Sequence, residues 1–234
     1  MPTQREIREW FDDLYDDYGL ESMRSERAYP VFLDYLEVRR GKRLLDVGCG
    51  TGFLLKEAAR RGLDPYGVDL SEEAVRLSRQ VIPGATVKVG RAEHLDFEDD
   101  FFHYVTCTAA LEHFVDMERG LREMRRVARK DARFCIMVPN SRSLVFRVFT
   151  ALNSIDEKSN ENAQPLEAWT RLLTGAGFEI LTVTRDRWWT RKVLLFLSLE
   201  KVGFIKRWVD RPSSSIIPLK YANQLIFILN HGPG

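Results

Sequence analysis

The feature that most constrains the fold is the run of residues 44–52, LLDVGCGTG. Apolar residues typical of a buried strand lead directly into three glycines at alternate positions, and a helical pattern begins near Phe53. Glycine lets the backbone turn sharply and lets a ligand approach the main chain closely. A helix that starts there directs free N–H groups and its positive dipole end at that ligand. The run therefore predicts a strand, a ligand-binding turn and a helix.

Two acidic residues narrow the choice of ligand. Asp46 lies two positions before the first glycine, where it would repel a pyrophosphate but attract a cation. Asp69 ends the next predicted strand, 17 residues beyond Gly52 and near the roughly 20-residue offset of an acid that binds ribose hydroxyls. The glycine spacing is G-x-G-x-G, not the G-x-G-x-x-G of a nicotinamide dinucleotide site. A simple glycine turn would explain neither acid.

The string DVGCGTG resembles motif I of the class I S-adenosylmethionine-dependent methyltransferases, in particular the small-molecule, type 11-like group. The resemblance covers roughly residues 40–185 and implies S-adenosyl-L-methionine as cofactor, with S-adenosyl-L-homocysteine as product. It implies that Gly48 and Gly50 pass close to the methionine part and that Asp46 attracts its ammonium group, often through water.

The resemblance also implies residues for the nucleoside part of the cofactor. It assigns the ribose hydroxyls to Asp69 and places Leu70 against the adenine. Members of the family usually carry an acid that accepts the adenine amino group, but Arg91 occupies that position here, and arginine has no acceptor. We therefore expect Glu93, or the backbone around Ala92, to replace the acid.

Further positions are predicted at the methionine end of the cofactor. Thr108 ends the fourth predicted strand and should face this end. Tyr15 and Tyr18 on the first predicted helix could close over the cofactor as leading helices do in relatives, or could simply pack against the core.

The segment Leu111-Glu112-His113 resembles the LEH sequence of small-molecule members of the family. Imidazole titrates near neutrality, so His113 is our candidate for a catalytic base. Alternatively, Glu112 and His113 brace the loop or orient the substrate. No further cluster of carboxylates or histidines completes a metal site, and we expect no metal.

Strand and helix patterns alternate along the chain and favour a doubly wound sheet. We predict an α/β fold with a Rossmann-like, seven-stranded, mostly parallel sheet, an antiparallel last strand, helices on both faces, extra N-terminal helices and a helical insertion before the last strand. The predicted strands are 43–47, 65–69, 86–90, 102–107, 133–138, 178–184 and 224–229, and the predicted helices are 3–18, 25–39, 53–61, 72–80, 116–129 and 165–175.

We expect one methyltransferase domain over residues 1–234, because no repeat or low-complexity tract divides it. Its predicted parts are an N-terminal helical cap (1–40), a cofactor-binding core (41–185), a helical insertion (186–221) and the last strand and tail (222–234).

The bulk properties limit the partners. A net charge of +1 gives no field that favours nucleic acid. The resemblance implies the same, because superfamily members that methylate adenine or cytosine amino groups usually carry an Asn/Asp-Pro-Pro-aromatic run after the fourth strand, and this sequence has none there. We therefore expect a small-molecule acceptor and no nucleic acid. The aromatic and basic stretch 186–211 could wall a pocket, contact a membrane or lipid peripherally, or form a dimer. Monomer and homodimer both stay open.

The three cysteines, Cys49, Cys107 and Cys135, form no C-x-x-C pair. Together with a polar N-terminus, this favours reduced thiols in a cytoplasmic protein.

The functional prediction is transfer of a methyl group by in-line displacement to an oxygen or nitrogen of a small molecule that is quinone-, lipid- or glycan-like. The alternative is a non-catalytic partner or regulatory protein that binds S-adenosylmethionine, since binding and transfer need the same residues.

Overall fold

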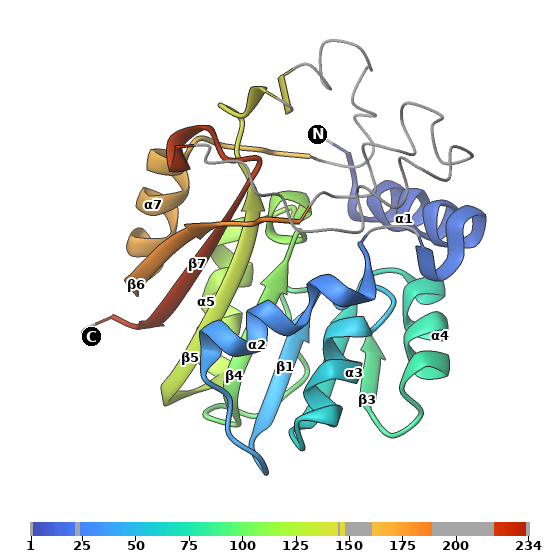
Figure 1. Cartoon of the computed structure of the whole chain (residues 1–234). Coiled ribbons are helices and arrows are strands. Elements are labelled where there is room, and N and C mark those ends of the chain that lie inside the picture. Colours follow the sequence, from blue (N-terminus) through green and yellow to red (C-terminus); the bar gives the residue numbers. More distant parts are fainter. Residues whose placement is uncertain (1, 22–23, 145, 148–160, 189–217, 233–234) are drawn as a thin grey trace.

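The computed structural model describes residues 2–21, 24–144, 146–147, 161–188 and 218–232. Seven strands form one sheet in the order β3-β2-β1-β4-β5-β7-β6, and β7 runs antiparallel to both of its neighbours (Figure 1). The predicted seven-stranded, mostly parallel sheet with an antiparallel last strand is therefore confirmed. The strands are β1 (Arg43–Val47), β2 (Asp64–Asp69), β3 (Thr86–Val89), β4 (Phe102–Thr108), β5 (Ala128–Pro139), β6 (Phe178–Arg185) and β7 (Gln224–His231).

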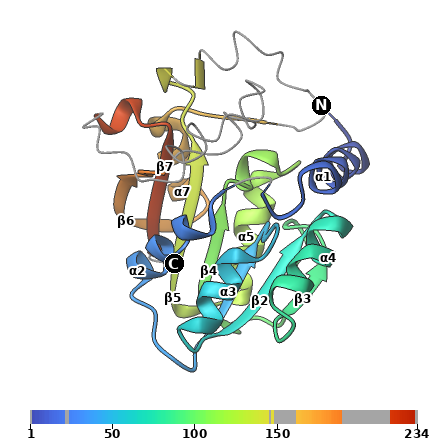
Figure 2. The same ribbon diagram turned by 45° about the vertical axis from the view of Figure 1, so that its right-hand side comes forward.

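The central strands are apolar on both sides because each face of the sheet is covered by helices. Successive side chains of a strand point to opposite faces. On β5, Phe134 and Ile136 belong to one hydrophobic cluster, whereas Cys135 and Met137 belong to the other. The sheet is thus the middle of three layers, with a separate core on each side (Figures 1 and 2).

Helices from different parts of the chain build the two outer layers. The core on one face contains buried residues of α2 (Pro30–Leu36), α3 (Phe53–Arg60) and α4 (Glu72–Val81). The other contains those of α5 (Met117–Val127) and α7 (Leu166–Gly175). Short 3-10 turns complete the described elements: η1 (Gly19–Glu21), η2 (Glu26–Ala28), η3 (Leu111–His113) and η5 (Leu219–Tyr221).

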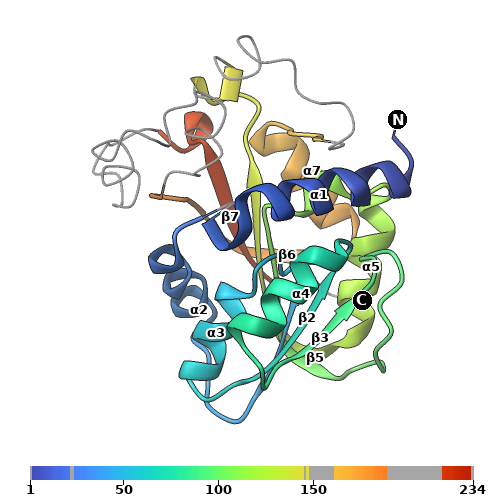
Figure 3. The ribbon, with the colours of Figure 1, turned by 90° about the vertical axis from the view of Figure 1, so that its right-hand side faces the viewer.

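Helix α1 (Gln4–Tyr18) lies across the end of the sheet near the start of α4 (Figure 3). Thr3 and Glu6 form a capping box at its N-terminus. Asp12 of α1 accepts hydrogen bonds from Ser71 Oγ at 2.6 Å and from the backbone N–H of Glu73 at 3.2 Å. Asp12 and the N-cap residue Ser71 therefore jointly satisfy the first turn of α4 and attach α1 to the core.

Two predicted helices differ from the structure. The helix expected over 25–39 is divided into η2 and α2, because Pro30 cannot continue a helix but is well suited to begin one. The helix expected over 116–129 ends at Val127, and β5 begins at Ala128, five residues before the strand we predicted. Pairing of Ala128 with Phe102 of β4 extends the strand into a charged stretch that lacks a strand pattern.

Most of the predicted insertion over 186–221 falls outside the described residues, as do residues 145 and 148–160 of the long connection after β5. In the described part of the chain, no helix combines the length and the apolar character that crossing a membrane requires.

Candidate cofactor and acceptor site

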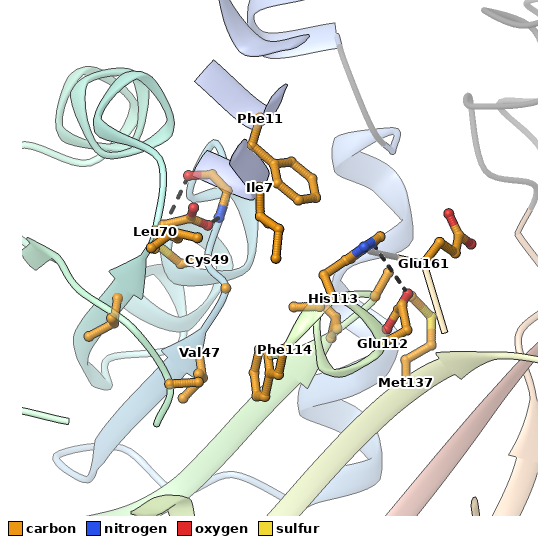
Figure 4. Close-up of a pocket in the computed structure, with 18 of the residues that line it drawn as sticks. Ile7, Phe11, Val47, Cys49, Leu70, Glu112, His113, Phe114, Met137 and Glu161 are labelled. Carbon is orange, nitrogen blue, oxygen red and sulfur yellow. Dashed lines mark hydrogen bonds and ion pairs between the residues drawn. The ribbon is translucent and has the colours of Figure 1, made fainter. Parts of the chain in front are cut away.

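A cavity of about 160 Å³ opens at the carboxyl ends of the central parallel strands. The chain crosses to opposite sides of the sheet at β1 and β4, the kind of position where α/β sheets bind ligands. Side chains from α1 reach into the cavity from above, opposite the strand ends (Figure 4). Its lining includes Ile7, Phe11, Tyr15, Arg24, residues 47–51, residues 68–70, residues 90–93, residues 108–110, residues 112–115 and Met137.

The glycine turn after β1 forms the floor of the cavity and has little room for side chains. Gly48 and Gly50 both have positive φ angles, of 73° and 49°. A Cβ on Gly48 would collide with the Ala110 side chain, and a Cβ on Gly50 would lie 2.8 Å from the Tyr15 hydroxyl. Glycine is therefore required both for backbone conformation and for space, as the motif predicted.

Asp69 lies at the end of β2, beside the glycine turn. Its Oδ2 accepts the N–H of Gly50 at 2.8 Å, and its Oδ1 accepts the N–H of Ser71 at 3.0 Å. A carboxylate has about four acceptor positions, so these bonds leave acceptor capacity for the hydroxyls of a ligand diol. Loss of solvent raises the pKa of Asp69 to about 6, although these two backbone hydrogen bonds oppose the rise.

Asp46 is not placed to contact a ligand in the cavity directly. It is 1% exposed, is not among the residues lining the cavity, and accepts a 2.6 Å hydrogen bond from Thr106 Oγ1. Burial raises the pKa of Asp46 to about 8, the hydrogen bond from Thr106 lowers it, and the charge of Asp69 raises it further. Asp46 therefore lies beneath the turn and would act on a ligand cation across the loop or through water.

The end of the cavity next to β3 contains the predicted base-binding residues. Leu70 and Ala92 both line it. Glu93 lines it too, but its Oε1 already accepts the N–H groups of Val115 at 3.0 Å and Asp116 at 3.3 Å. Glu93 thus holds the segment that leads into α5.

Arg91 also lines this end, and its Nη1 donates to Gln4 Oε1 of α1 at 3.0 Å. Sequence reasoning did not single out Gln4, because the contact joins residues 87 positions apart.

The opposite end of the cavity lies beyond Thr108, which lines it as predicted, and holds Glu112 and His113 of η3. Both are buried, and Glu112 Oε1 lies 3.9 Å from His113 Nε2 (Figure 4). Phe11 of α1 packs edge-on against the His113 ring, with the two centroids 5.0 Å apart.

Glu161 lines this end of the cavity as well, and the neighbouring Asn162 donates its backbone N–H to the carbonyl oxygen of Glu112 at 3.0 Å. The chain that follows β5 therefore returns to the LEH segment.

Arg24 is a lining residue that the sequence did not reveal. It is 5% exposed and donates to both carboxylate oxygens of Asp186, at 2.5 and 2.9 Å. Its guanidinium group lies over the Phe32 ring and 3.5 Å from the sulfur of Met137. Its Nε is buried, and no described group accepts a hydrogen bond from it.

The two tyrosines of α1 have different positions. Tyr15 is 5% exposed and lines the cavity, with its hydroxyl directed at Gly50. Burial raises the pKa of Tyr15 well above its ordinary value. Tyr18 is 39% exposed and does not line the cavity, because it lies almost one turn further along, at the end of the helix. Of the two tyrosines expected to close over the cofactor, Tyr15 lines the cavity and Tyr18 does not.

The described residues include no group of three or more histidines, cysteines and carboxylates placed to hold a metal ion. The three cysteines are free and buried.

Comparisons with known proteins agree with this geometry. Residues 45–136 match the family model of the methyltransferase domain. The ubiquinone biosynthesis O-methyltransferase of Hahella chejuensis is 34% identical over 52% of this chain and 56% of its own length. The demethylmenaquinone methyltransferase of Symbiobacterium thermophilum is 31% identical over 63% of this chain and 66% of its own length. The aligned part of this chain thus spans less than two thirds of either relative.

A solved structure from Thermotoga maritima, of an S-adenosylmethionine-dependent methyltransferase and possible histamine N-methyltransferase, superposes with a TM-score of 0.68. It is 19% identical and the match covers 97% of this chain and 99% of that one, which shows a shared fold. The family match shows a methyltransferase domain over residues 45–136, and the superposition shows that the chain shares the fold of an S-adenosylmethionine-dependent methyltransferase.

Proposed function

We propose that this protein transfers the methyl group of S-adenosylmethionine to an oxygen or nitrogen of a small, largely apolar acceptor. The observation that carries the proposal is the continuity of one cavity: it runs from the residues after β3, past Asp69 and the glycine turn, to Glu112 and His113 at the other end. The names of the two curated relatives support a quinone-like acceptor.

The cofactor-binding residues follow from charge and position. Asp69 binds the two ribose hydroxyls, and the turn at Gly48 and Gly50 supports the amino-acid part. Asp46 attracts the ammonium group from beneath the turn. Arg24 lines the cavity and, beside its ion pair with Asp186, presents a guanidinium group to the carboxylate of the cofactor.

When bound, S-adenosylmethionine supplies a methyl group that its sulfonium already activates. The protein's residues then have to hold the acceptor in line and exclude water. Helix α1 contributes Phe11 and Tyr15 to the cavity wall, which covers the site from the solvent side. His113 accepts the proton of an acceptor hydroxyl or amine, and the charge of Glu112, 3.9 Å away, favours the imidazolium that forms.

The test has two stages. Calorimetry should first show that the protein binds S-adenosylmethionine and S-adenosylhomocysteine but not NAD. A panel of quinol, phenol, lipid and amine acceptors is then screened for production of S-adenosylhomocysteine. Binding of neither cofactor form would refute the proposal, and binding without turnover on any acceptor would favour the regulatory alternative.

The role of His113 can be separated from a structural role. His113→Asn should lower kcat by about 10²- to 10⁴-fold, the usual contribution of a general base, while cofactor affinity stays unchanged. His94→Asn is the matched control, because His94 is exposed and lies outside the cavity. An unchanged kcat with a raised KM would instead assign His113 to substrate orientation.

A further inference from the structure

The order of the strands at the carboxyl edge of the sheet indicates where each part of a bound cofactor would lie. The turn after β1 and Asp69 after β2 are adjacent, and β3 is the next strand beyond β2. With the amino-acid part at β1 and the ribose at β2, the adenine base lies beside the residues that follow β3. At that end, Arg91 and Gln4 both line the cavity.

The polar groups at this end differ in what they can offer to a base. Arg91 has only donors, and the exocyclic amino group of adenine needs an acceptor. Glu93 can only accept: its Oε1 already receives two backbone N–H groups, and its Oε2 offers no donor for a ring nitrogen of the base. Gln4 carries a carbonyl oxygen and an NH₂ group on one planar amide, which is the pattern that pairs with the amino group and N7 of adenine.

An exposed hydrogen bond from Arg91 orients the Gln4 amide at the rim of the cavity. Arg91 Nη1 donates to Gln4 Oε1 at 3.0 Å, which distinguishes the oxygen end of the amide from its nitrogen end. A carbonyl oxygen has two lone pairs, so one stays available after this bond. The backbone position of Gln4 is itself fixed at the start of α1, since Thr3 and Glu6 form the capping box there.

We propose that Gln4 reads the adenine base and that Arg91 is the residue that positions it. Gln4 Oε1 accepts the exocyclic amino group, and its NH₂ group donates to N7. The acid that the family pattern usually provides after the third strand is thereby replaced by an amide from the N-terminal helix. This inference rests on the proposed function, because it assumes that S-adenosylmethionine binds in this cavity.

The test compares S-adenosylhomocysteine with its deaminated analogue, in which hypoxanthine replaces adenine. The analogue presents an oxygen to Gln4 Oε1 where adenine presents an amino group. Calorimetric titration of the full chain should give an affinity for the adenine form on the order of tenfold to a hundredfold higher. Gln4→Met, which keeps a long helix-forming side chain, should lower affinity for the adenine form and reduce the preference to about twofold or less.

The role of Arg91 is tested by the ratio of the affinities for the adenine and hypoxanthine forms. Loss of a merely structural contact would weaken binding of both forms and leave this ratio unchanged. Arg91→Ala should reduce the preference for adenine, and Arg91→Lys should restore part of it, because a lysine can also donate to Gln4 Oε1. The matched control is Arg5→Ala, next to Gln4 on α1, since Arg5 is exposed and forms an ion pair with Glu9 of the same helix. This control should keep the full preference.

Three outcomes are decisive. A wild-type preference that disappears in Gln4→Met supports the proposal. A preference that survives Gln4→Met, in a protein with an unchanged melting temperature, overturns it while leaving the proposed function intact. If the wild-type protein binds neither form, the proposed function fails and this inference fails with it.

Discussion

The two ends of the cavity are built in different ways. At the end near β1 and β2, Gly50 and Asp69 are joined by a 2.8 Å hydrogen bond across 19 residues of a single strand-helix-strand unit. At the other end, Arg24 meets Asp186 across 162 residues, and Asn162 meets Glu112 across 50. The first end is a local motif, whereas the second exists only once distant segments have packed. Variants at the long-range end should therefore lose folding stability, whereas variants at the local end should lose ligand affinity.

The largest expected effect is on folding, at the long-range end. Arg24→Met should lower the free energy of unfolding by about 3–5 kcal/mol, because it leaves Asp186 buried without its partner. Chemical denaturation measures the loss. The double variant Arg24→Met/Asp186→Leu should recover most of the stability but still bind S-adenosylhomocysteine weakly. Wild-type affinity for S-adenosylhomocysteine in the double variant would show that Arg24 has a structural role and does not bind the cofactor.

At the local end, the effect should be on binding. Asp69→Ala should weaken binding of S-adenosylhomocysteine by roughly 1–3 kcal/mol, since the ribose hydroxyls lose their acceptor. Calorimetry provides the measurement, and Asp64→Ala is a control at the opposite, exposed end of the same strand. Asp64 also accepts a hydrogen bond from Tyr66, so its small effect should appear in stability and not in affinity. Unchanged affinity in Asp69→Ala would contradict the assignment of this end.

The pH dependence should distinguish the two carboxylates of the local end. The pKa of Asp46 is raised to about 8 and that of Asp69 to about 6, so the folded protein binds these protons more tightly than the unfolded chain does. Stability without ligand should therefore fall as the pH rises from about 4 to about 8. Cofactor affinity should change in the opposite direction, because the ammonium group favours ionised Asp46.

We expect cofactor affinity to rise on the order of tenfold between about pH 6 and about pH 7, where the α-amino group of the cofactor is still protonated and the ionised fraction of Asp46 increases. Proton release on binding near neutral pH, measured by calorimetry in buffers of different ionisation enthalpy, checks the same linkage. Asp46→Asn should abolish the proton release. Release that persists in this variant would assign the proton to another group.

The smallest effect on stability should come from the contact that attaches α1 to the start of α4, above the cavity. Asp12→Ala removes the acceptor for Ser71 Oγ and the N–H of Glu73, and should cost about 1 kcal/mol of stability, as loss of a helix cap does. Asp13→Ala, on the exposed side of the same helix, is the control. Equal melting temperatures for the two variants would show that Asp12 does not hold the helix in place.

The sequence predicted the sheet well because its signals are local. Strand patterns and breakers lie within a few residues of one another, and the resemblance to a known family placed the antiparallel last strand. The errors occurred where a local pattern was overridden: Pro30 divided a helix that hydrophobic periodicity had extended through it, and pairing with β4 drew the charged start of β5 into the sheet.

By itself, the sequence determined the glycine turn and the position of Asp69, since both depend on backbone geometry within one strand-turn-helix unit. Only the tertiary structure decided that Asp46 lies beneath the cavity, that Tyr15 lines it in place of Tyr18, and that Gln4 and Arg24 belong to its wall. These positions depend on how α1 and the chain around residues 24 and 186 pack on the sheet. Contacts between segments so far apart leave no spacing pattern in the sequence, because the distance that matters arises only on folding.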